Sequence, residues 1–436
     1  MRKILFLVGM LFIFGCNSSK KTSVVATPWT GIKQMGVIAE DTAAWDTATD
    51  SIGNVYVTGT TYGNLDGNIL AGTVDAFLVK YDALGVKQWS KLLGVAGVGT
   101  EAYGIAVDPS GNIYITGYTN GNLANTLAGT LDYFLAKYDS SGNLIWVRQE
   151  GVASSSSSGS KLVIDSSGNP YICGSTTGNL NGETKTGIRD VFVIKYDFSG
   201  TLQDTFLMGV SIQHTNCNDI TLSITGNFYL TGETSGGLGG QTVNGSYDAY
   251  ILKLDSSLSP QWTRLIGASS FFTTGKGIDV DSSENVYMAG YTTGSLPGHT
   301  LIGNFDLFVT KYNSSGSQQF LDQVGVAGAS AFSEELVVDS NDNIFIAGRT
   351  SGNLGGETLT GTGDAALLKY DASGNRIFTK LLGTAGAYTG GYAITYDAFS
   401  SSLFIVGETE GGLGTNTITG DSDLYVAKYS TDGVLQ

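Results

Sequence analysis

The chain has 436 residues, of which 62 are glycine, 41% are hydrophobic and only 14% are charged. This balance excludes a disordered chain, which lacks the hydrophobic residues for a core, and a coiled coil, which needs more charge and less glycine. The net charge of −16 also disfavours nucleic-acid binding, which needs a basic face, so the composition predicts many short strands joined by tight turns.

A lipoprotein signal peptide is predicted for residues 1–15. Arg2 and Lys3 precede an apolar run that ends at Phe14 and is too short to span a bilayer. The sequence IFGC, which ends at Cys16, resembles a bacterial lipobox, although Phe14 replaces the small residue usual at its position. The resemblance implies that Cys16 becomes the N-terminus and carries lipid, including a palmitate-type acyl chain. The alternative is an ordinary secretory cleavage site with Cys16 nearby.

Residues 16–28 are predicted to form a lipidated tether, because they are largely polar and have no helical period. Asn17 follows Cys16, where an Asp would resemble an inner-membrane retention signal, so the outer membrane is favoured. We therefore expect a monomer that is anchored to the membrane through Cys16 and surface-exposed in the bacterial cell envelope. The sequence leaves open whether the anchor faces the periplasm or the exterior.

Residues 29–436 are predicted to consist of seven copies of one unit. The segment DAFLVKY, which begins at Asp75, recurs at intervals of 57 to 59 residues, and a glycine that ends segments such as NVYVTG recurs with the same period. Two marks with one period indicate an internal repeat. The aspartates are Asp75, Asp132, Asp190, Asp248, Asp306, Asp364 and Asp423, and the glycines are Gly59, Gly117, Gly174, Gly232, Gly290, Gly348 and Gly407.

Each unit contains four strand-like segments that are apolar on both alternating faces, as expected for sheets buried on two sides. D-x-x-G turns join the first segment to the second and the third to the fourth. In such a turn the Asp side chain accepts a backbone N–H and the Gly takes positive φ, so both connections are predicted to be tight hairpins. In the second copy the segments are 104–108, 112–117, 132–138 and 143–148.

The two ends of the chain predict a closed ring. Trp89, Trp146 and Trp262 each follow the motif lysine of their copy, but the last copy ends before this position is reached. The segment that begins at Trp29 resembles the missing outer strand. We therefore predict an all-β, seven-bladed β-propeller with four antiparallel strands per blade, in which the N-terminal strand closes the last blade.

The units resemble the SBBP repeat through the pattern DSSGNxYxxGxTxGNL followed by DxFxxKYDxxGxxxW, in every copy from residue 29 to 436. Two departures are Ser223, which replaces a hairpin Asp, and Pro170, whose missing N–H would weaken pairing at the start of its strand but is tolerable at a first residue. The resemblance implies an extracytoplasmic propeller with no defined chemistry.

No catalytic, cofactor or metal site is predicted. His214 lies close to Cys217, but a Cys-His pair without an orienting group is a weak sign of a nucleophile. Cys173 fits a small buried residue, and whether Cys173 and Cys217 form a disulfide stays open. The hairpin aspartates are expected to cap their own turns, because each turn offers one carboxylate and calcium needs several; calcium dependence stays an alternative. The motif lysines are expected to reach a carboxylate or carbonyl of a neighbouring blade.

Function is predicted on the face that carries the long loops between second and third strands, around the central mouth of the ring. The expected function is a non-catalytic binding module for a protein or a glycan. The predicted ligand-binding residues lie in these loops and are Asn64, Asn122, Asn179, Asn353 and His299.

Two other functions remain open. One is a hydrolase or lyase that uses carboxylates alone in the channel, with Asp219, Glu334 and Glu335 as candidates because these acids interrupt the repeat. The other is a structural component of the envelope.

Overall fold

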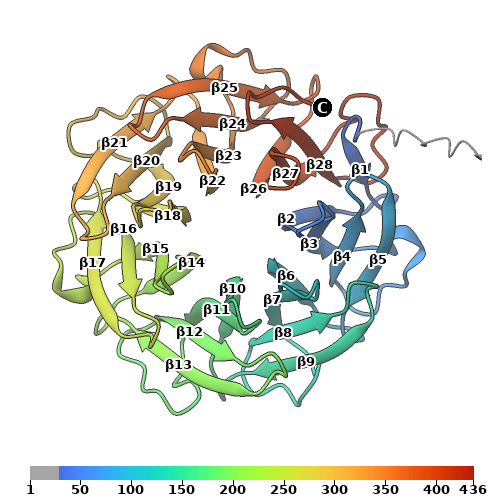
Figure 1. The fold of residues 1–436 in the computed structure, drawn as a ribbon, viewed down its shortest axis with the longest axis horizontal. Coiled ribbons are helices and arrows are strands. Elements are labelled where there is room, and N and C mark those ends of the chain that lie inside the picture. The colour runs from blue at the N-terminus through green and yellow to red at the C-terminus, as the bar shows by residue number, and fades with distance from the viewer. Residues whose placement is uncertain (1–28) are drawn as a thin grey trace, which may run out of the picture.

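The computed structural model describes residues 29–436, so the predicted signal peptide and the whole predicted tether, including Cys16, lie outside the described residues. Within this part the chain forms seven four-stranded antiparallel sheets, arranged as blades around a central axis (Figure 1). The predicted seven-bladed propeller is therefore confirmed. No helix in residues 29–436 is long and apolar enough to cross a membrane.

The strands follow one another from the axis to the rim in each blade. Blades one to three contain β2 (Thr42–Thr49), β3 (Val55–Thr61), β4 (Asp75–Tyr81) and β5 (Lys87–Leu93); β6 (Thr100–Val107), β7 (Ile113–Thr119), β8 (Asp132–Tyr138) and β9 (Leu144–Glu150); and β10 (Ser157–Ile164), β11 (Pro170–Thr176), β12 (Asp190–Tyr196) and β13 (Leu202–Met208). Blades four and five contain β14 (Thr215–Leu222), β15 (Phe228–Thr234), β16 (Asp248–Leu254) and β17 (Pro260–Ile266); and β18 (Thr273–Val280), β19 (Val286–Thr292), β20 (Asp306–Tyr312) and β21 (Gln318–Val324). Blades six and seven contain β22 (Ala331–Val338), β23 (Ile344–Thr350), β24 (Asp364–Tyr370) and β25 (Arg376–Leu382); and β26 (Thr389–Asp397), β27 (Ser402–Thr409), β28 (Asp423–Ser430) and β1 (Lys33–Met35). Short 3-10 helices lie in three of the long loops: η1 (Leu65–Gly67), η2 (Leu238–Gly240) and η3 (Leu354–Gly356).

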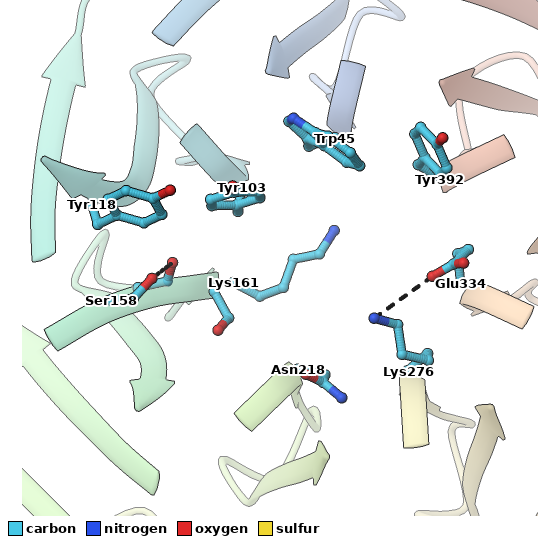
Figure 2. Close-up of a pocket in the computed structure, with 11 residues that line it drawn as sticks. Trp45, Tyr103, Tyr118, Ser158, Lys161, Asn218, Lys276, Glu334 and Tyr392 are labelled. Atoms are coloured by element: carbon cyan, nitrogen blue, oxygen red, sulfur yellow. Dashed lines mark hydrogen bonds and ion pairs between the residues drawn. The ribbon is translucent and has the colours of Figure 1, made fainter. Parts of the chain in front are cut away.

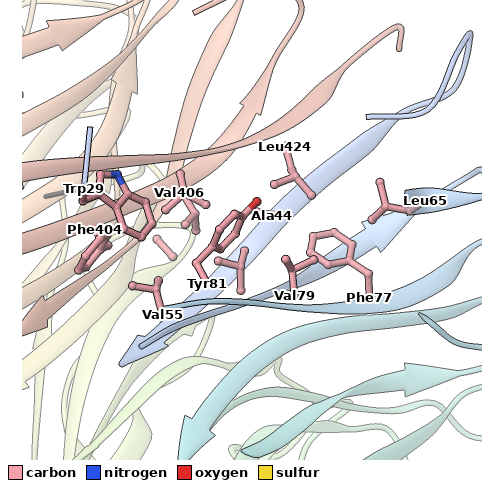
Figure 3. Packing of buried hydrophobic residues seen from close by; sticks show 13 residues of the cluster. Trp29, Ala44, Val55, Leu65, Phe77, Val79, Tyr81, Phe404, Val406 and Leu424 are labelled. Atoms are coloured by element: carbon pink, nitrogen blue, oxygen red, sulfur yellow. The ribbon is translucent and has the colours of Figure 1, made fainter. Parts of the chain in front are cut away.

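The N-terminal strand closes the ring, as predicted. β1 pairs antiparallel with β28, with Lys33 opposite Val426. Trp29, which precedes β1, is only 3% exposed and packs against Phe404 of the last blade and Tyr81 of the first, with ring centroids 5.0 and 5.8 Å apart (Figure 3). One buried aromatic side chain therefore joins the first blade to the last.

The hairpin aspartates cap their own turns, as expected. Asp108 Oδ1 accepts the N–H groups of Ser110 and Asn112 at 2.9 Å, and its Oδ2 accepts the Asn112 amide at 2.7 Å. This arrangement recurs in blades one, three, five and six. Pro170 is the first residue of β11, a position where a missing N–H is tolerable.

Blade four replaces its missing aspartate with a carboxylate from the next blade. Glu284, in the first hairpin of blade five, accepts hydrogen bonds from Ser223 Oγ at 2.9 Å, from the Asn227 amide at 3.0 Å and from the Tyr229 hydroxyl at 3.2 Å. The hairpin therefore keeps a carboxylate partner although its own sequence lacks one.

The motif aspartates hold loops within their own blades, whereas motif lysines reach the next blade. Asp75 is fully buried and accepts the N–H groups of Ala71 and Gly72, which closes the long loop of its own blade. Lys80 lies over the Tyr56 ring and donates to the Ser140 carbonyl of the next blade at 3.1 Å, so the expected contact with a neighbouring blade is present. All seven motif lysines lie over an aromatic ring: Lys80, Lys137, Lys195, Lys253, Lys311, Lys369 and Lys428.

Candidate functional site

A ring of seven β-bulges surrounds one mouth of the central channel. Each innermost strand shifts register against its neighbour at the same place, which leaves one extra residue there. Bulges redirect side chains and are common next to functional sites. The seven bulge residues all line a single cavity of about 380 Å³, and they are Trp45, Tyr103, Ser160, Asn218, Lys276, Glu334 and Tyr392. Every blade thus has the same backbone bulge, whereas the side chain at the bulge position differs among the blades.

This mouth lies on the face with the long loops. Tyr118, which also lines the cavity, is the penultimate residue of β7, immediately before the long loop of blade two. The structure therefore places a cavity at the central mouth of the loop face, where the sequence located binding.

One side of the mouth is aromatic. Tyr392, Trp45 and Tyr103 come from three neighbouring blades, and Tyr118 continues the series; we call these four residues the aromatic arc (Figure 2). Trp45 stacks on Tyr392 with centroids 4.7 Å apart, and Trp45 and Tyr103 lie 5.8 Å apart. The Trp45 indole donates to Thr60 Oγ1 at 3.0 Å, which fixes the ring in place.

The opposite side is polar. Ser160, Asn218, Lys276 and Glu334 form what we call the polar arc, on blades three to six. Figure 2 labels Asn218, Lys276 and Glu334. Glu334 pairs with Arg349 at 3.2 Å, whereas its distance to the Lys276 ammonium is 3.6 Å. Lys276 is thus the less firmly held of the two cations.

Two glutamates accept hydrogen bonds from the three tyrosines of the aromatic arc. Glu101 accepts hydrogen bonds from the hydroxyls of Tyr103 at 2.5 Å and Tyr118 at 2.7 Å. At the other end Glu408 accepts the Tyr392 hydroxyl at 2.6 Å. Burial raises the pKa of Glu408 above its ordinary value, against the lowering effect of the Tyr392 hydrogen bond. The three tyrosine rings of the arc are therefore held in place through their hydroxyl groups.

A buried charge cluster closes the channel beneath the mouth. The Lys161 ammonium crosses the channel to Asp46 at 2.7 Å and Glu335 at 3.0 Å, and Asp219 lies near it; we call these four residues the charged floor. Lys161 lines the mouth cavity and also a second cavity of about 370 Å³ on the hairpin side. The mouth is therefore a blind pocket and not an open tunnel.

The carboxylates of the floor also connect adjacent blades. Asp46 accepts the N–H of Ile105 at 2.8 Å, Asp219 that of Ile278 at 2.8 Å, and Glu335 that of Ile394 at 3.0 Å. In each case the donor belongs to the innermost strand of the next blade. The floor is therefore part of the framework that joins the ring.

The environment of the floor shifts its pKa values. Burial raises the pKa of Glu335 to about 8 and that of Asp219 to about 7, although Lys161 lowers both. Burial also raises the pKa of Asp46. Burial alone would lower the pKa of Lys161, but the surrounding carboxylates, Asp46 first, raise it above its ordinary value. Lys161 therefore stays charged at neutral pH.

The loop residues predicted to bind ligand lie away from this mouth. The helices η1, η2 and η3 pack against the outer strands β5, β17 and β25. The four asparagines, all exposed, each accept a backbone N–H within their own loop, and His299 Nε2 lies 3.1 Å from the Leu321 carbonyl on outer strand β21. The asparagines and their donors are Asn64 and Leu70, Asn122 and Leu127, Asn179 and Lys185, and Asn353 and Leu359. These bonds give the asparagines a structural role, and ligand binding by them stays a prediction.

The three acids proposed for channel chemistry do lie on the channel: Glu334 in the polar arc, Asp219 and Glu335 in the floor. We did not predict the aromatic arc from the sequence. Its signal is present in the sequence, because positions 45, 103 and 392 are equivalent in the repeat, and alignment of the seven copies would have shown one position with a different kind of residue in most blades.

Cys173 and Cys217 are free, buried thiols in one hydrophobic cluster. Burial raises the pKa of Cys217 well above its ordinary value, which opposes the thiolate that a nucleophile requires. Among residues 29–436 no group of three or more His, Cys, Asp and Glu side chains is placed to hold a metal ion.

Comparison with known proteins identifies the repeat. Residues 88–124, 145–181, 261–297 and 319–355 match the SBBP family model, described as a beta-propeller repeat, so the chain carries SBBP repeats. An uncharacterized WD repeat-containing protein of Acanthamoeba polyphaga mimivirus is 25% identical over 371 residues, 64% of this chain and 26% of that protein. Regulatory protein FlaEY of Caulobacter vibrioides is 24% identical over 356 residues, 70% of this chain and 35% of that protein. The chain thus spans only 26% to 35% of the length of these curated relatives.

Solved structures resemble the chain in fold. A chain of the mitotic checkpoint complex superposes with a TM-score of 0.51 at 11% identity, over 92% of this chain and 95% of that one. A streptogramin B lyase superposes with a TM-score of 0.52 at 11% identity, over 92% of this chain and 98% of that one. At this identity the likeness shows the propeller fold alone.

Proposed function

We propose that the chain is a non-catalytic glycan-binding module that takes the end of a saccharide into the channel mouth. The observation that carries the proposal is the division of the bulge ring into an aromatic arc and a polar arc around one blind cavity. A sugar ring has C–H faces that pack against aromatic rings and hydroxyl groups that hydrogen-bond to side chains such as Asn218 and Glu334. Pockets of this kind combine an apolar wall with a few polar groups that fix orientation.

The shape of the site favours a glycan over a protein. Pockets for small ligands typically measure about 300–1,000 Å³, and this cavity of about 380 Å³, with Lys161 at its floor, lies within that range. The end of a saccharide fits such a pocket better than a broad protein surface does.

The proposal is tested with an oligosaccharide array and titration calorimetry on the purified full-length chain. Trp45→Ala should weaken binding of the array's best ligand at least ~tenfold, since an aromatic contact at a buried site contributes over 1 kcal/mol. Phe198→Ala is the matched control, because Phe198 is 62% exposed on an outer hairpin. Binding that survives Trp45→Ala, or an array on which no saccharide binds, would overturn the proposal.

A second candidate is a glycan hydrolase or lyase, favoured by the raised pKa of Glu335, which suits a general acid. Binding without catalysis has better support, because the floor carboxylates already accept hydrogen bonds from other groups of the protein. Both oxygens of Asp219 accept backbone N–H groups, and those of Glu335 bond Lys161 and the Ile394 N–H. Release of shortened products from the best ligand, lost in Glu335→Gln, would support the enzyme instead.

We also propose that Cys16 anchors the module to the outer membrane as a lipoprotein. The support is the lipobox-like sequence before Cys16. Metabolic labelling with an alkyne palmitate analogue should mark the wild-type chain and not Cys16→Ser. Secretion of an unlabelled, unanchored wild-type chain would favour the ordinary signal peptide.

A further inference from the structure

The described chain enters the propeller from the hairpin face, which carries the tight turns and lies opposite the channel mouth. β28 runs from the long loop of the last blade to its final hairpin, and β1 pairs antiparallel with it, with Lys33 opposite Val426. The residues just before β1 therefore lie on the hairpin side. A Cβ atom at Gly85 would stand 2.7 Å from the Trp29 ring, so Trp29 lies against the second hairpin of blade one.

Exposed apolar side chains lie beside this entry point, at the tips of hairpins. Ile52 and Leu84 belong to the two hairpins of blade one, and Phe399 belongs to the first hairpin of blade seven. A Cβ atom at Gly53 would stand 2.8 Å from the Phe399 ring and 3.3 Å from the Ala83 side chain, so the three hairpins are adjacent. Ile52 is 63% exposed and Phe399 is 64% exposed. We call Ile52, Leu84 and Phe399 the entry patch.

Another apolar tip lies on the same face at the far side of the ring. Ile224, in the first hairpin of blade four, is 90% exposed, and blade four lies across the axis from blade one (Figure 1). Exposed apolar residues also occur on the loop face, Ile302 among them, so exposure alone does not decide which face meets a partner. The entry point of the chain is the feature that distinguishes the two faces.

The predicted anchor is closer to the hairpin face. Residues 17–28 separate Cys16 from Trp29, and they span at most about 40 Å when fully extended. To reach a membrane at the loop face they would first have to run the depth of a blade, which is about 23 Å for a 7-residue strand such as β4. A membrane at the hairpin face requires no such detour.

A lipid surface suits the exposed tips better than a single chain segment does. Among residues 17–28 only Val24 and Val25 are large aliphatic residues, which are too few to cover tips on blades one, four and seven. A membrane is broad enough to meet all of these tips at once. An anchor also makes the contact between tips and membrane intramolecular, so apolar contacts that are weak one by one are sufficient to set an orientation.

We infer that the hairpin face lies against the lipid surface to which Cys16 is anchored, with the entry patch in the headgroup region and the channel mouth directed away from the membrane. This inference rests on the proposed Cys16 anchor and adds a lipid-contact surface and an orientation. In this orientation the mouth is open to a saccharide that arrives from the side opposite the membrane.

The test places an environment-sensitive dye at one position at a time in the full-length, lipidated chain. Phe399→Cys and Ile224→Cys report on the hairpin face, and Ile302→Cys, in a long loop, is the matched control. The two cysteines among residues 29–436 are buried, which confines labelling to the introduced thiol. Each chain is reconstituted into phosphatidylcholine vesicles that contain a lipid with a nitroxide quencher near the headgroup. Phosphatidylcholine has no net charge, so the acidic chain is not repelled.

The dye at position 399 should be quenched several times more strongly than the dye at position 302, and the dye at position 224 should resemble the dye at 399. Removal of the other two patch side chains in Ile52→Ser/Leu84→Ser should lower quenching at 399 toward the level at 302. Ile69→Ser, in an exposed part of a long loop, should leave quenching at 399 unchanged.

Equal or stronger quenching at position 302 overturns the inference and leaves the anchor intact, as does quenching at 399 that survives the double substitution. A dye at 399 that is shielded from water but not quenched also overturns it, because residues 17–28 or a second copy of the chain would then cover the patch. A wild-type chain that does not float with the vesicles overturns the Cys16 anchor together with the inference. Saccharide binding at the mouth is measured separately and does not depend on any of these outcomes.

Discussion

Replacing Lys161 with methionine should destabilise the ring, because Lys161 is the cation that the carboxylates of the channel floor share. Its ammonium lies 2.7 Å from Asp46 and 3.0 Å from Glu335, and its side chain is 14% exposed. Methionine keeps the length and much of the packing of the lysine stem but carries no charge.

The expected loss of folding stability in Lys161→Met depends on which floor carboxylate stays ionised. Removing one partner of a buried ion pair costs about 3–5 kcal/mol, since a charge is left without compensation. The pKa of Glu335 is about 8 with Lys161 present, and Lys161 lowers it. Glu335 is therefore already protonated at pH 7 in the variant, and Asp46 is the main uncompensated charge. We expect a loss of roughly 3 kcal/mol at pH 7.

The loss of folding stability in Lys161→Met should be smaller at lower pH. Without Lys161, the folded pKa values of Asp46 and Glu335 rise further above their unfolded values, so the folded chain binds more protons than the unfolded chain. Stability of the variant therefore rises as pH falls, and the gap to wild type should be much smaller at pH 5 than at pH 8.

The assay is urea unfolding at pH 5, 7 and 8, followed by tryptophan fluorescence. Lys276→Met is the matched control: its ammonium lies 3.6 Å from Glu334 and the side chain is 29% exposed, so the effect should stay below about 1 kcal/mol. An unchanged midpoint for Lys161→Met at pH 7 would refute the charge argument. A loss of equal size at all three pH values would assign the effect to packing.

Three further predictions concern the whole propeller. The folded pKa values of Glu335, about 8, and Asp219, about 7, exceed their ordinary values. The stability that these two groups contribute is therefore present near pH 5 and is lost as pH rises through 7 to 8. Thermal melts should show a higher Tm at pH 5 than at pH 8, and this difference in Tm should be smaller in Glu335→Gln. Trp29→Ala should cost about 3–5 kcal/mol and speed limited proteolysis at the N-terminal strand, because a side chain buried between first and last blades is lost; proteolysis at the wild-type rate would contradict this. Cys173 and Cys217 should resist iodoacetamide in the folded chain and react after denaturation, since both thiols are buried; mass spectrometry of intact protein measures this, and rapid labelling without denaturant would contradict the packing.

The amino-acid sequence by itself determined the repeat, the four strands of each blade, the capped hairpins and the closure by the segment after Trp29. These features depend on short-range chemistry: an Asp that accepts N–H groups two and four residues ahead, a glycine at positive φ, and apolar strands of fixed length. The unit that carries these signals is also repeated seven times, which makes the period evident without knowledge of any contact.

Only the tertiary structure decided which residues share the mouth. Trp45 and Tyr392 stand at opposite ends of the chain and stack only because the ring closes, and Lys161 meets Glu335 across 174 residues of sequence. The hairpin at Ser223 lacks its own aspartate, and the carboxylate of Glu284 from the next blade takes its place. The sequence of either hairpin alone does not show this contact. Turn and strand chemistry acts within one unit, whereas the channel is formed by one side chain from each unit, and its composition emerges only when the seven blades are placed around a common axis.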